Sequence, residues 1–490
     1  MPLAPPPAAR TLPELLARQA AARGEATALQ TAEGAIPYAR LAELADSAAA
    51  RLAYEWKVRA GDRVAWLGGN HAGQLVLLFA LARLGAILLP LNFRLAPGEW
   101  DALIADCGPV RVLHDGTWAQ AAGELAARHG IEANPVEALL APCSAPAAPA
   151  NDAPQAPVLL VYTSGTTGGP KAAVHTQANL LANMAIAAHV QGMTPAETVL
   201  TVLPLFHVGG LCIQTLPALH AGARVVLHAR FAPDETLAAI ANERPTLTLL
   251  VPAVMKALID HPRWAEADLS CLRAVWAGSS LLPAPLLEAF HARGVPVCNV
   301  YGATETGPFS IALPPAHART HVGSCGWPAP GVEARLAHLH GDAGEVWLRG
   351  PNVVQRYWPD APACDDEGWF HTGDLATQAA DGSYTIVGRA KDLIISGGEN
   401  IHPVEIENVL SQHPAVAECA AFGAPDAQWG EAVAVAVVLR AGAQADEPAL
   451  RAHLEGRLAR YKLPRRWVFI DALPKTALGK VQRNRLAQLL

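Results

Sequence analysis

Short apolar runs alternate with longer helical patterns along most of the chain. Runs of strand length lie at Val158–Val161, Leu247–Val251, Arg273–Ala277 and Val295–Val300, and segments of helix length separate them. Strands rich in Val and Leu that are joined through helices are typical of a parallel sheet buried on both faces. We therefore expect an α/β fold whose ligands bind beyond the carboxyl ends of the strands.

The first helix carries clear signals at both ends. Thr11 is a suitable cap, Glu14 stands three residues further on as in a capping box, and Gly24 follows the last turn. The most apolar stretch, Leu75–Leu91, is interrupted by Arg83, so it does not read as a bilayer span. A buried helix followed by a buried strand is the better interpretation of that stretch.

The pattern changes near Lys391. Strand-like runs at Ala415–Phe422 and Ala432–Leu439 precede a helix predicted at Glu447–Arg460 and a strand predicted at Trp467–Ile470. This order of elements is typical of a small α+β domain of about 100 residues.

Two domains are therefore expected: residues 1–390, with mixed or parallel sheets, and a smaller α+β domain at 391–490. The segment Pro142–Pro157 is rich in alanine and proline. Such a composition predicts a surface linker, here one between two subdomains of the larger domain.

Composition narrows the class of protein. The chain is 51% hydrophobic and 17% charged, with a formal charge of −7, so no basic stripe is available for nucleic acid. The start, Met1–Arg10, is proline-rich and has no apolar core of an export signal. The eight cysteines form no CxxC pair, which argues against a zinc site or a disulfide framework and for reduced thiols in a cytoplasmic protein.

A glycine- and hydroxyl-rich loop follows the strand at Val158–Val161. Its sequence, YTSGTTGGPK, ends at Lys171. Glycines let the backbone turn tightly and present amides, the hydroxyls donate hydrogen bonds, and the lysine adds positive charge, so the set suits a polyphosphate. Because Pro170 precedes the lysine and Ala172 follows it, this is not the Walker loop. The alternative is an ordinary Ser/Gly/Thr turn.

Further candidate motifs follow other strands. In YGATETG, Tyr301 could stack on a purine and Glu305 is a hard oxygen ligand for Mg²⁺, although a Thr-Glu pair in this place often only caps a helix. In HTGD, Asp374 could hold a ribose with help from Arg389, although Thr-Gly-Asp is also a common turn. Near the end, PKTALGK places Lys480 beside a glycine, where a solvated basic face is the alternative.

The order of these motifs, together with the block GRAKDLIISGGENIHPVEIE, resembles the adenylate-forming superfamily of acyl-CoA synthetases, firefly-type luciferases and nonribosomal peptide synthetase adenylation domains. The resemblance extends from the first helix to Lys480. It implies an ATP-dependent enzyme that makes an acyl-adenylate from a carboxylic acid and then passes the acyl group to coenzyme A. ATP, Mg²⁺ and coenzyme A are the cofactors and co-substrates that it implies.

The resemblance also implies roles for individual residues. Lys480 would bridge the reacting carboxylate and the α-phosphate, Thr304 would contact that phosphate, and Glu305 would hold Mg²⁺. Lys391 would be the hinge of the small domain, and His207 would gate the acyl pocket. The implied nucleotide- and coenzyme-binding residues are Thr163, Ser164, Gly165, Thr166, Thr167, Gly168, Lys171, Gly278, Ser279, Tyr301, Gly302, Ala303, Thr304, Asp374, Arg389, Lys391, Gly397 and Gly398.

The acyl group is expected to be hydrophobic, either fatty or aromatic. The pocket candidates are apolar or small: Val208, Gly210, Val251, Met255, Ser279, Val300, Ala303 and Pro308. No acidic residue among them could pair with an amino group, which argues against an amino acid as substrate. No arginine stands out as a clamp for a second carboxylate, which argues against a dicarboxylate.

Alternatives remain open. The chain could load a carrier protein instead of coenzyme A, or be a non-catalytic homologue, although Lys171, Glu305, Asp374 and Lys480 are all present. A luciferase-like oxygenase has no supporting residue. The acid, the pathway and the choice between monomer and homodimer are not determined by the sequence.

Overall fold

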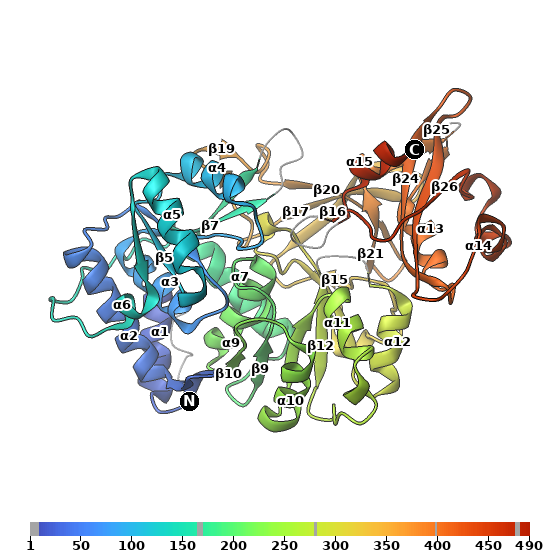
Figure 1. Cartoon of the computed structure of the whole chain (residues 1–490). Coiled ribbons are helices and arrows are strands. Elements are labelled where there is room, and N and C mark those ends of the chain that lie inside the picture. Colours follow the sequence, from blue (N-terminus) through green and yellow to red (C-terminus); the bar gives the residue numbers. More distant parts are fainter. Residues whose placement is uncertain (1–8, 164–169, 279–281, 397–398, 476–480) are drawn as a thin grey trace.

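The computed structural model describes residues 9–163, 170–278, 282–396, 399–475 and 481–490. Its strands form the sheets A to D, and the chain runs from A and B through C to D (Figure 1). Sheet A runs in the order β15 (Trp327–Pro328), β14 (Ile311–Ala312), β13 (Val297–Tyr301), β12 (Ala274–Gly278), β11 (Leu247–Leu250), β9 (Thr198–Thr201), β10 (Arg224–Leu227), β1 (Thr27–Thr31), β2 (Gly34–Pro37). Sheet B runs in the order β19 (Ala361–Pro362), β18 (Arg356–Tyr357), β8 (Lys171–Thr176), β7 (Pro157–Thr163), β4 (Ile87–Pro90), β3 (Arg63–Leu67), β5 (Arg111–His114), β6 (Glu132–Pro135).

Sheets A and B confirm the predicted α/β class. Strands β9 to β13 of sheet A pair in parallel with their neighbours, as do β3 to β7 of sheet B. The parallel prediction is incomplete at the edges, because β7 pairs antiparallel with β8 and β13 pairs antiparallel with β14. At both places fewer than ten residues separate the paired strands, which is too few for the crossover connection that parallel pairing requires.

Helices cover both faces of the parallel strands. In β3, Val64 and Trp66 join the core shared with sheet A, whereas Ala65 and Leu67 join a second core. The helices around sheets A and B are α1 (Leu12–Arg23), α2 (Tyr38–Ala50), α3 (Ala72–Leu84), α4 (Pro97–Cys107), α5 (Ala119–His129), α6 (Val136–Leu140), α7 (Gln177–Val190), α8 (Val208–Gly210), α9 (Leu216–Ala221), α10 (Pro233–Glu243), α11 (Pro252–Ile259) and α12 (Ala284–Ala292). In the described ranges, no helix combines the length and apolar character that crossing a membrane requires.

Several local predictions are confirmed. Oγ1 of Thr11 accepts a hydrogen bond from the backbone N–H of Glu14 and caps α1. The return bond of the capping box goes one residue further, because the Glu14 carboxylate accepts from the backbone of Arg10. The apolar stretch Leu75–Leu91 forms most of α3 and all of β4, and it is buried.

The linker prediction for Pro142–Pro157 is wrong about what the segment joins. It leads from α6, which follows the edge strand β6, to the interior strand β7 of the same sheet. The segment is also tied down, because Asn151 donates its N–H to the carbonyl of Arg83 at 2.7 Å and Arg83 donates to the carbonyl of Ala148. It is therefore a crossover packed against α3.

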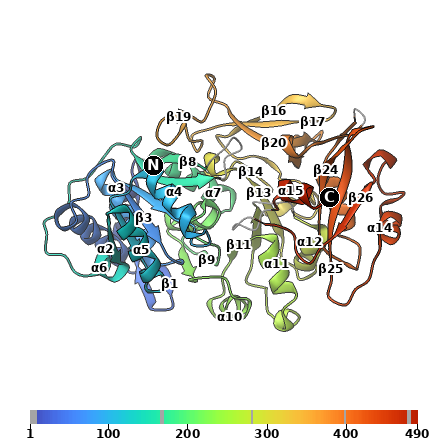
Figure 2. The same ribbon diagram turned by 45° about the horizontal axis from the view of Figure 1, so that its top comes forward.

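Sheet C is antiparallel and lies between the large sheets and the C-terminal elements (Figure 2). It runs in the order β16 (Glu333–His340), β17 (Ala343–Arg349), β20 (Phe370–Gln378), β21 (Tyr384–Arg389). The HTGD motif lies inside strand β20, so it is not the simple turn that the sequence allowed.

Sheet D and its helices form the small α+β unit at one end of the molecule (Figure 1). Its strands run in the order β23 (Glu399–Ile401), β22 (Ile394–Ser396), β25 (Gly430–Leu439), β24 (Val416–Asp426), with β26 (Arg466–Phe469) beside β25, and its helices are α13 (Pro403–Leu410), α14 (Glu447–Leu454) and α15 (Arg483–Leu486). The helix predicted at Glu447–Arg460 is shorter than expected. It ends at Leu454 because Glu455 is extended and Gly456 has a φ of 78°.

Candidate active site

Tyr301, Asp374 and Arg389 form a chain of contacts between sheets A and C. The Tyr301 hydroxyl donates to Oδ2 of Asp374 at 2.9 Å, and Nε of Arg389 lies 2.7 Å from Oδ1. Tyr301 ends β13, whereas Asp374 and Arg389 are directly paired on β20 and β21. Burial and the nearby carboxylate raise the pKa of Tyr301 well above its usual value, so the phenol is a neutral donor.

A bulge in β20 presents Asp374. Gly373 has a φ of 68°, in the left-handed region that favours glycine, and donates its N–H to the Glu345 carboxylate at 2.9 Å. Thr372 donates its hydroxyl to the carbonyl of Val346 and accepts from the N–H of Asp374. The bulge thus fixes the backbone on both sides of a buried carboxylate that the sequence motif could only suggest.

The turn after β13 carries Glu305 and is held by buried amides. Residues Thr304–Thr306 form a 3-10 turn. Asn352 donates to the carbonyl of Thr306 at 2.6 Å, and Asn183 of α7 accepts from the N–H of Phe309 at 3.0 Å. A Cβ on Gly302 would lie 1.8 Å from the carbonyl oxygen of Pro308, so this position tolerates only glycine. The packing therefore determines where Glu305 points.

Glu305 contacts a residue from sheet B. Its Oε1 accepts a hydrogen bond of 2.9 Å from the Tyr357 hydroxyl, and Nζ of Lys171 lies 5.5 Å from the centroid of the Tyr357 ring. Burial and the Glu305 charge raise the pKa of Tyr357, which keeps the phenol protonated. The turn after β13, strand β18 and the start of β8 thereby meet at one place.

The surroundings of Glu305 suit a divalent cation. The carboxylate is 8% exposed, and in the described part of the chain no cationic side chain pairs with it. No group of three or more His, Cys, Asp or Glu side chains that could hold a metal occurs among the described residues. A single carboxylate leaves most ligand positions to phosphate oxygens and water, which is how Mg²⁺ is commonly bound with nucleotides.

The predicted phosphate loop connects β7 to β8. Thr163 and Lys171 are paired at the ends of these strands, and Tyr162 donates its hydroxyl to Asp106. Thr163 and Lys171 therefore mark the two points at which the loop leaves the sheet. The remaining predicted residues Ser164, Gly165, Thr166, Thr167, Gly168, Ser279, Gly397, Gly398 and Lys480 lie outside the described residues.

His207 caps the short helix α8 in an apolar environment. Its Nδ1 accepts from the N–H of Gly209 at 2.9 Å, so in the neutral ring the proton is on Nε2. Burial lowers the pKa of His207 to about 4, so the ring is neutral near pH 7. Of the described pocket candidates, Val208, Gly210, Met255, Val300 and Pro308 are buried, whereas Val251 and Ala303 are partly exposed. The nearby Gly278 cannot bear a side chain, because its ideal Cβ would lie 2.5 Å from the carbonyl oxygen of Val300.

Lys391 lies in an exposed 3-10 turn, Ala390–Asp392, directly after β21. The neighbouring Asp392 is approached by Arg483, which also pairs with Glu407 of α13 at 2.6 Å. Arg483 begins α15, just beyond the segment that includes Lys480. Arg483 therefore links the turn that contains Lys391 to the C-terminal helix α15.

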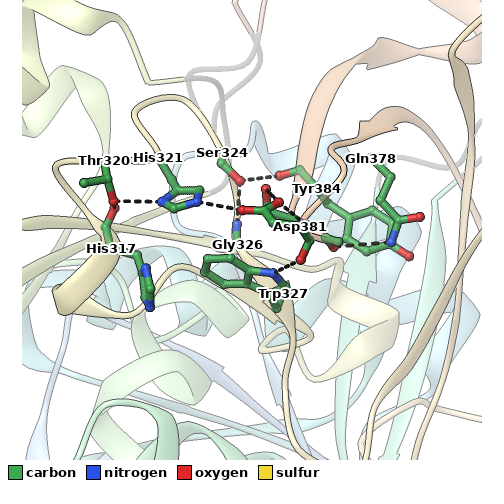
Figure 3. A network of polar contacts seen from close by, with 11 residues as sticks. His317, Thr320, His321, Ser324, Gly326, Trp327, Gln378, Asp381 and Tyr384 are labelled. Carbon is green, nitrogen blue, oxygen red and sulfur yellow. Dashed lines mark hydrogen bonds and ion pairs between the residues drawn. The ribbon is translucent and has the colours of Figure 1, made fainter.

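A separate polar network connects sheets A and C away from Glu305 (Figure 3). Nε2 of His321 lies 2.8 Å from Oδ2 of Asp381, and Trp327 donates its indole N–H to the carbonyl of Asp381 at 3.0 Å. Ser324 donates to the carbonyl of Tyr384 at 2.8 Å. Because β15 belongs to sheet A and Tyr384 begins β21, the network ties sheet A to sheet C at a second place.

The sequence did not reveal Tyr357 or the buried asparagines. Tyr357 is 52 residues from Glu305 and lies in a two-residue strand, so no local pattern connects them. Asn183 and Asn352 look like ordinary polar residues between apolar ones. The available signal was a polar residue within an apolar segment, because a polar group buried there needs a hydrogen-bond partner.

Family models and known relatives match this chain over most of its length. Residues 16–358 match the model of the AMP-binding enzyme family, and residues 405–480 match the model of the AMP-binding enzyme C-terminal domain. An indoleacetate–CoA ligase of Aromatoleum aromaticum is 43% identical, with 98% of each chain covered, and a feruloyl-CoA synthase of Amycolatopsis is 40% identical, with 95% of this chain and 96% of the relative covered.

Among solved structures, the o-succinylbenzoate CoA synthetase MenE of Bacillus subtilis in complex with its acyl-adenylate intermediate superposes with a TM-score of 0.88 at 31% identity, covering 96% of this chain and 97% of that one. The same enzyme has been solved with ATP and a magnesium ion, with a TM-score of 0.87 at 31% identity, covering 96% of this chain and 98% of that one. The chain belongs to the AMP-binding enzyme family and is an acid–thiol ligase of the acyl-CoA synthetase branch.

Proposed function

We propose that this enzyme activates a hydrophobic, aromatic carboxylic acid and joins it to coenzyme A. In the first half-reaction the carboxylate attacks the α-phosphorus of ATP, giving acyl-AMP and pyrophosphate. In the second, the thiol of coenzyme A attacks the acyl carbon, giving the thioester, AMP and a proton. The observation that carries the proposal is the position of Asp374, which Tyr301 and Arg389 hold between sheets A and C. Four residues after Tyr301, Glu305 contacts Tyr357 of sheet B.

The described residues suit an adenine nucleotide. The Asp374 carboxylate, held by Arg389, would accept hydrogen bonds from the ribose hydroxyls, and the Tyr301 ring would lie against adenine. Thr163 and Lys171 would contact phosphates together with residues 164–168, and Thr304 would contact the α-phosphate. Gly278, Gly302 and Ala303, with Ser279, would line the adenine and acyl sites.

Glu305 would hold Mg²⁺. The bound cation would neutralise charge on the phosphate oxygens. The turn Thr304–Thr306 and the Tyr357 hydroxyl orient the Glu305 carboxylate for this role.

Lys480 would bridge the reacting carboxylate and the α-phosphate during adenylation. For thioester formation we propose that residues 391–490 rotate about Lys391 as a small domain relative to 1–390. Gly397 and Gly398 would then line the path of the pantetheine chain. The exposed turn Ala390–Asp392 supports a hinge at this place.

An aromatic acid is supported from two sides. The indoleacetate–CoA ligase and feruloyl-CoA synthase relatives are named for aromatic acids. The pocket candidates Val208, Met255 and Val300 are apolar and buried, and His207 is neutral. Such surroundings favour any hydrophobic acyl group, because its transfer from water is favourable, and the two relatives favour an aromatic one.

A pyrophosphate-release screen tests the proposal. The purified enzyme, ATP and Mg²⁺ would be incubated with arylacetic, cinnamic, benzoic, medium-chain fatty and short dicarboxylic acids. Each reaction would be run once with coenzyme A and once with a carrier protein as the acyl acceptor, and the products would be identified. Aromatic acids should give the highest kcat/KM, with AMP and the CoA thioester as products. Preference for a dicarboxylate, or acyl transfer only to the carrier protein, would contradict it.

A further inference from the structure

Tyr357 contacts both groups that the proposed function assigns to the triphosphate. Its hydroxyl donates to Oε1 of Glu305 at 2.9 Å, and the Lys171 ammonium lies 5.5 Å from the centroid of its ring. An ammonium at this distance from an aromatic ring is attracted to the ring. One side chain thus connects the cation of the phosphate loop with the carboxylate that suits Mg²⁺.

Backbone hydrogen bonds hold Tyr357 in place. Strand β18 pairs with β8 so that Tyr357 lies opposite Ala173, and the N–H of Trp358 donates to the carbonyl of Ala172 at 2.8 Å. On the same segment, the N–H of Val354 donates to the carbonyl of Glu305 at 2.8 Å. These bonds hold the segment that carries Tyr357 between β8 and the turn that contains Glu305.

This arrangement leaves one carboxylate oxygen available. Oε1 of Glu305 accepts from Tyr357, and within the described ranges its side chain has no other hydrogen bond or ion pair. Donors that hold a metal-ligating carboxylate fix its orientation, and their loss commonly lowers metal affinity about 10- to 100-fold.

On the basis of the function proposed above, we propose that Tyr357 is a positioning residue for magnesium–ATP. Its hydroxyl directs the free oxygen of Glu305 toward the metal, and its ring keeps the Lys171 ammonium beside the phosphates. AMP lacks the β- and γ-phosphates, so Tyr357 contributes nothing to its binding.

Tyr357→Phe tests the hydroxyl alone, because it keeps the ring under Lys171. Mg²⁺ would be titrated at fixed ATP and acid in a pyrophosphate-release assay, and binding of magnesium–ATP and of AMP would be measured by calorimetry. The Mg²⁺ concentration for half-maximal rate should rise about tenfold or more. Saturating Mg²⁺ should restore most of the rate, magnesium–ATP affinity should fall, and AMP affinity should not change.

Two further variants complete the test. Tyr357→Leu also removes the ring, so it should weaken magnesium–ATP binding further, with less rescue by Mg²⁺. Tyr38→Phe is the matched control, because the Tyr38 hydroxyl is buried and donates to the carbonyl of Ala223, away from the site. It should leave the Mg²⁺ titration unchanged.

The inference is overturned if Tyr357→Phe titrates with Mg²⁺ like the unmodified enzyme, or if AMP binding falls as much as magnesium–ATP binding, because either result indicates a purely structural role. A failure of the proposed function looks different: the unmodified enzyme would then release no pyrophosphate at any Mg²⁺ concentration.

Discussion

The Tyr301 hydroxyl lies 2.9 Å from Oδ2 of Asp374, so the end of strand β13 and the bulge of strand β20 form one hydrogen-bonded unit. Arg389 completes the unit from the paired strand β21 at 2.7 Å. The contact joins sheets A and C at the carboxyl end of a parallel strand, where ligands of α/β proteins bind.

Replacing Asp374 with Asn should weaken AMP binding about 10- to 100-fold, because a charged acceptor for two ribose hydroxyls becomes a neutral amide that cannot accept both. Calorimetry with AMP measures the loss. Asp260→Asn is the control, since the Asp260 carboxylate pairs with Lys256 on the surface. If Asp374→Asn and the control bound AMP with equal affinity, Asp374 would not be a ribose-binding residue.

Lys480→Ala should lower the rate of adenylation about 10²- to 10³-fold, the usual cost of losing one charged transition-state contact. Thioester formation from supplied acyl-AMP should be spared, because that step follows the departure of pyrophosphate. Single-turnover assays of each half-reaction provide the comparison. Equal losses in both would count against a small domain that rotates.

Lys391→Pro should show the opposite pattern. Proline restricts the backbone of the exposed turn Ala390–Asp392, where the proposed rotation takes place. Adenylation should persist while transfer to coenzyme A is lost. If the variant forms the thioester from acyl-AMP at the normal rate, the hinge does not lie at this residue.

Gly302→Ala should reduce kcat/KM about 10²-fold, because its Cβ would meet the carbonyl of Pro308 at 1.8 Å and displace the turn that carries Glu305. Gly123→Ala is a suitable control: it lies in α5, and an added Cβ there meets nothing within 4 Å. The control should retain activity. A fully active Gly302→Ala would show that the turn can shift without consequence.

His175 predicts a specific dependence of stability on pH. It is fully buried, neither ring nitrogen has a hydrogen-bond partner among the described residues, and burial lowers its pKa to about 4. The unfolded chain binds the proton near pH 6.5 and the folded chain only near pH 4, so protonation favours unfolding. The penalty is absent above about pH 6.5 and grows to about 3 kcal/mol as the pH falls to 4.

His175→Leu should remove that dependence. Urea unfolding at pH 7 and pH 5 should show a variant at least as stable as the parent at pH 7, because an unpaired buried polar group is lost, and more stable than the parent at pH 5. Parallel losses of stability in both proteins between the two pH values would place the responsible group elsewhere.

Local signals predicted much of the fold. The cap at Thr11 and the apolar stretch Leu75–Leu91 are encoded within a few residues, and both match the structure. The predicted end of α14 is wrong, because the helix stops before Gly456, a residue that often follows a helix end, although Arg457–Arg460 are good helix formers. The crossover at Pro142–Pro157 was misread because contacts with α3, not composition, hold it.

In the candidate site too, local motifs were predictable and contacts between distant residues were not. Asp374 and Arg389 belong to recognisable motifs, and their direct pairing on β20 and β21 confirms that they lie together. Tyr357 and Asn352 could not be predicted, because their partners at Glu305 and Thr306 lie 52 and 46 residues away. Which side chain meets which across sheets A, B and C depends on the packing of the whole chain.

A crystal structure of the enzyme with bound AMP would test the central claim most directly. The account predicts ribose hydroxyls within hydrogen-bond distance of the Asp374 carboxylate, adenine against Tyr301, and the phosphate near Thr304. A nucleotide bound elsewhere, with no ribose hydroxyl within hydrogen-bond distance of the Asp374 carboxylate, would contradict it.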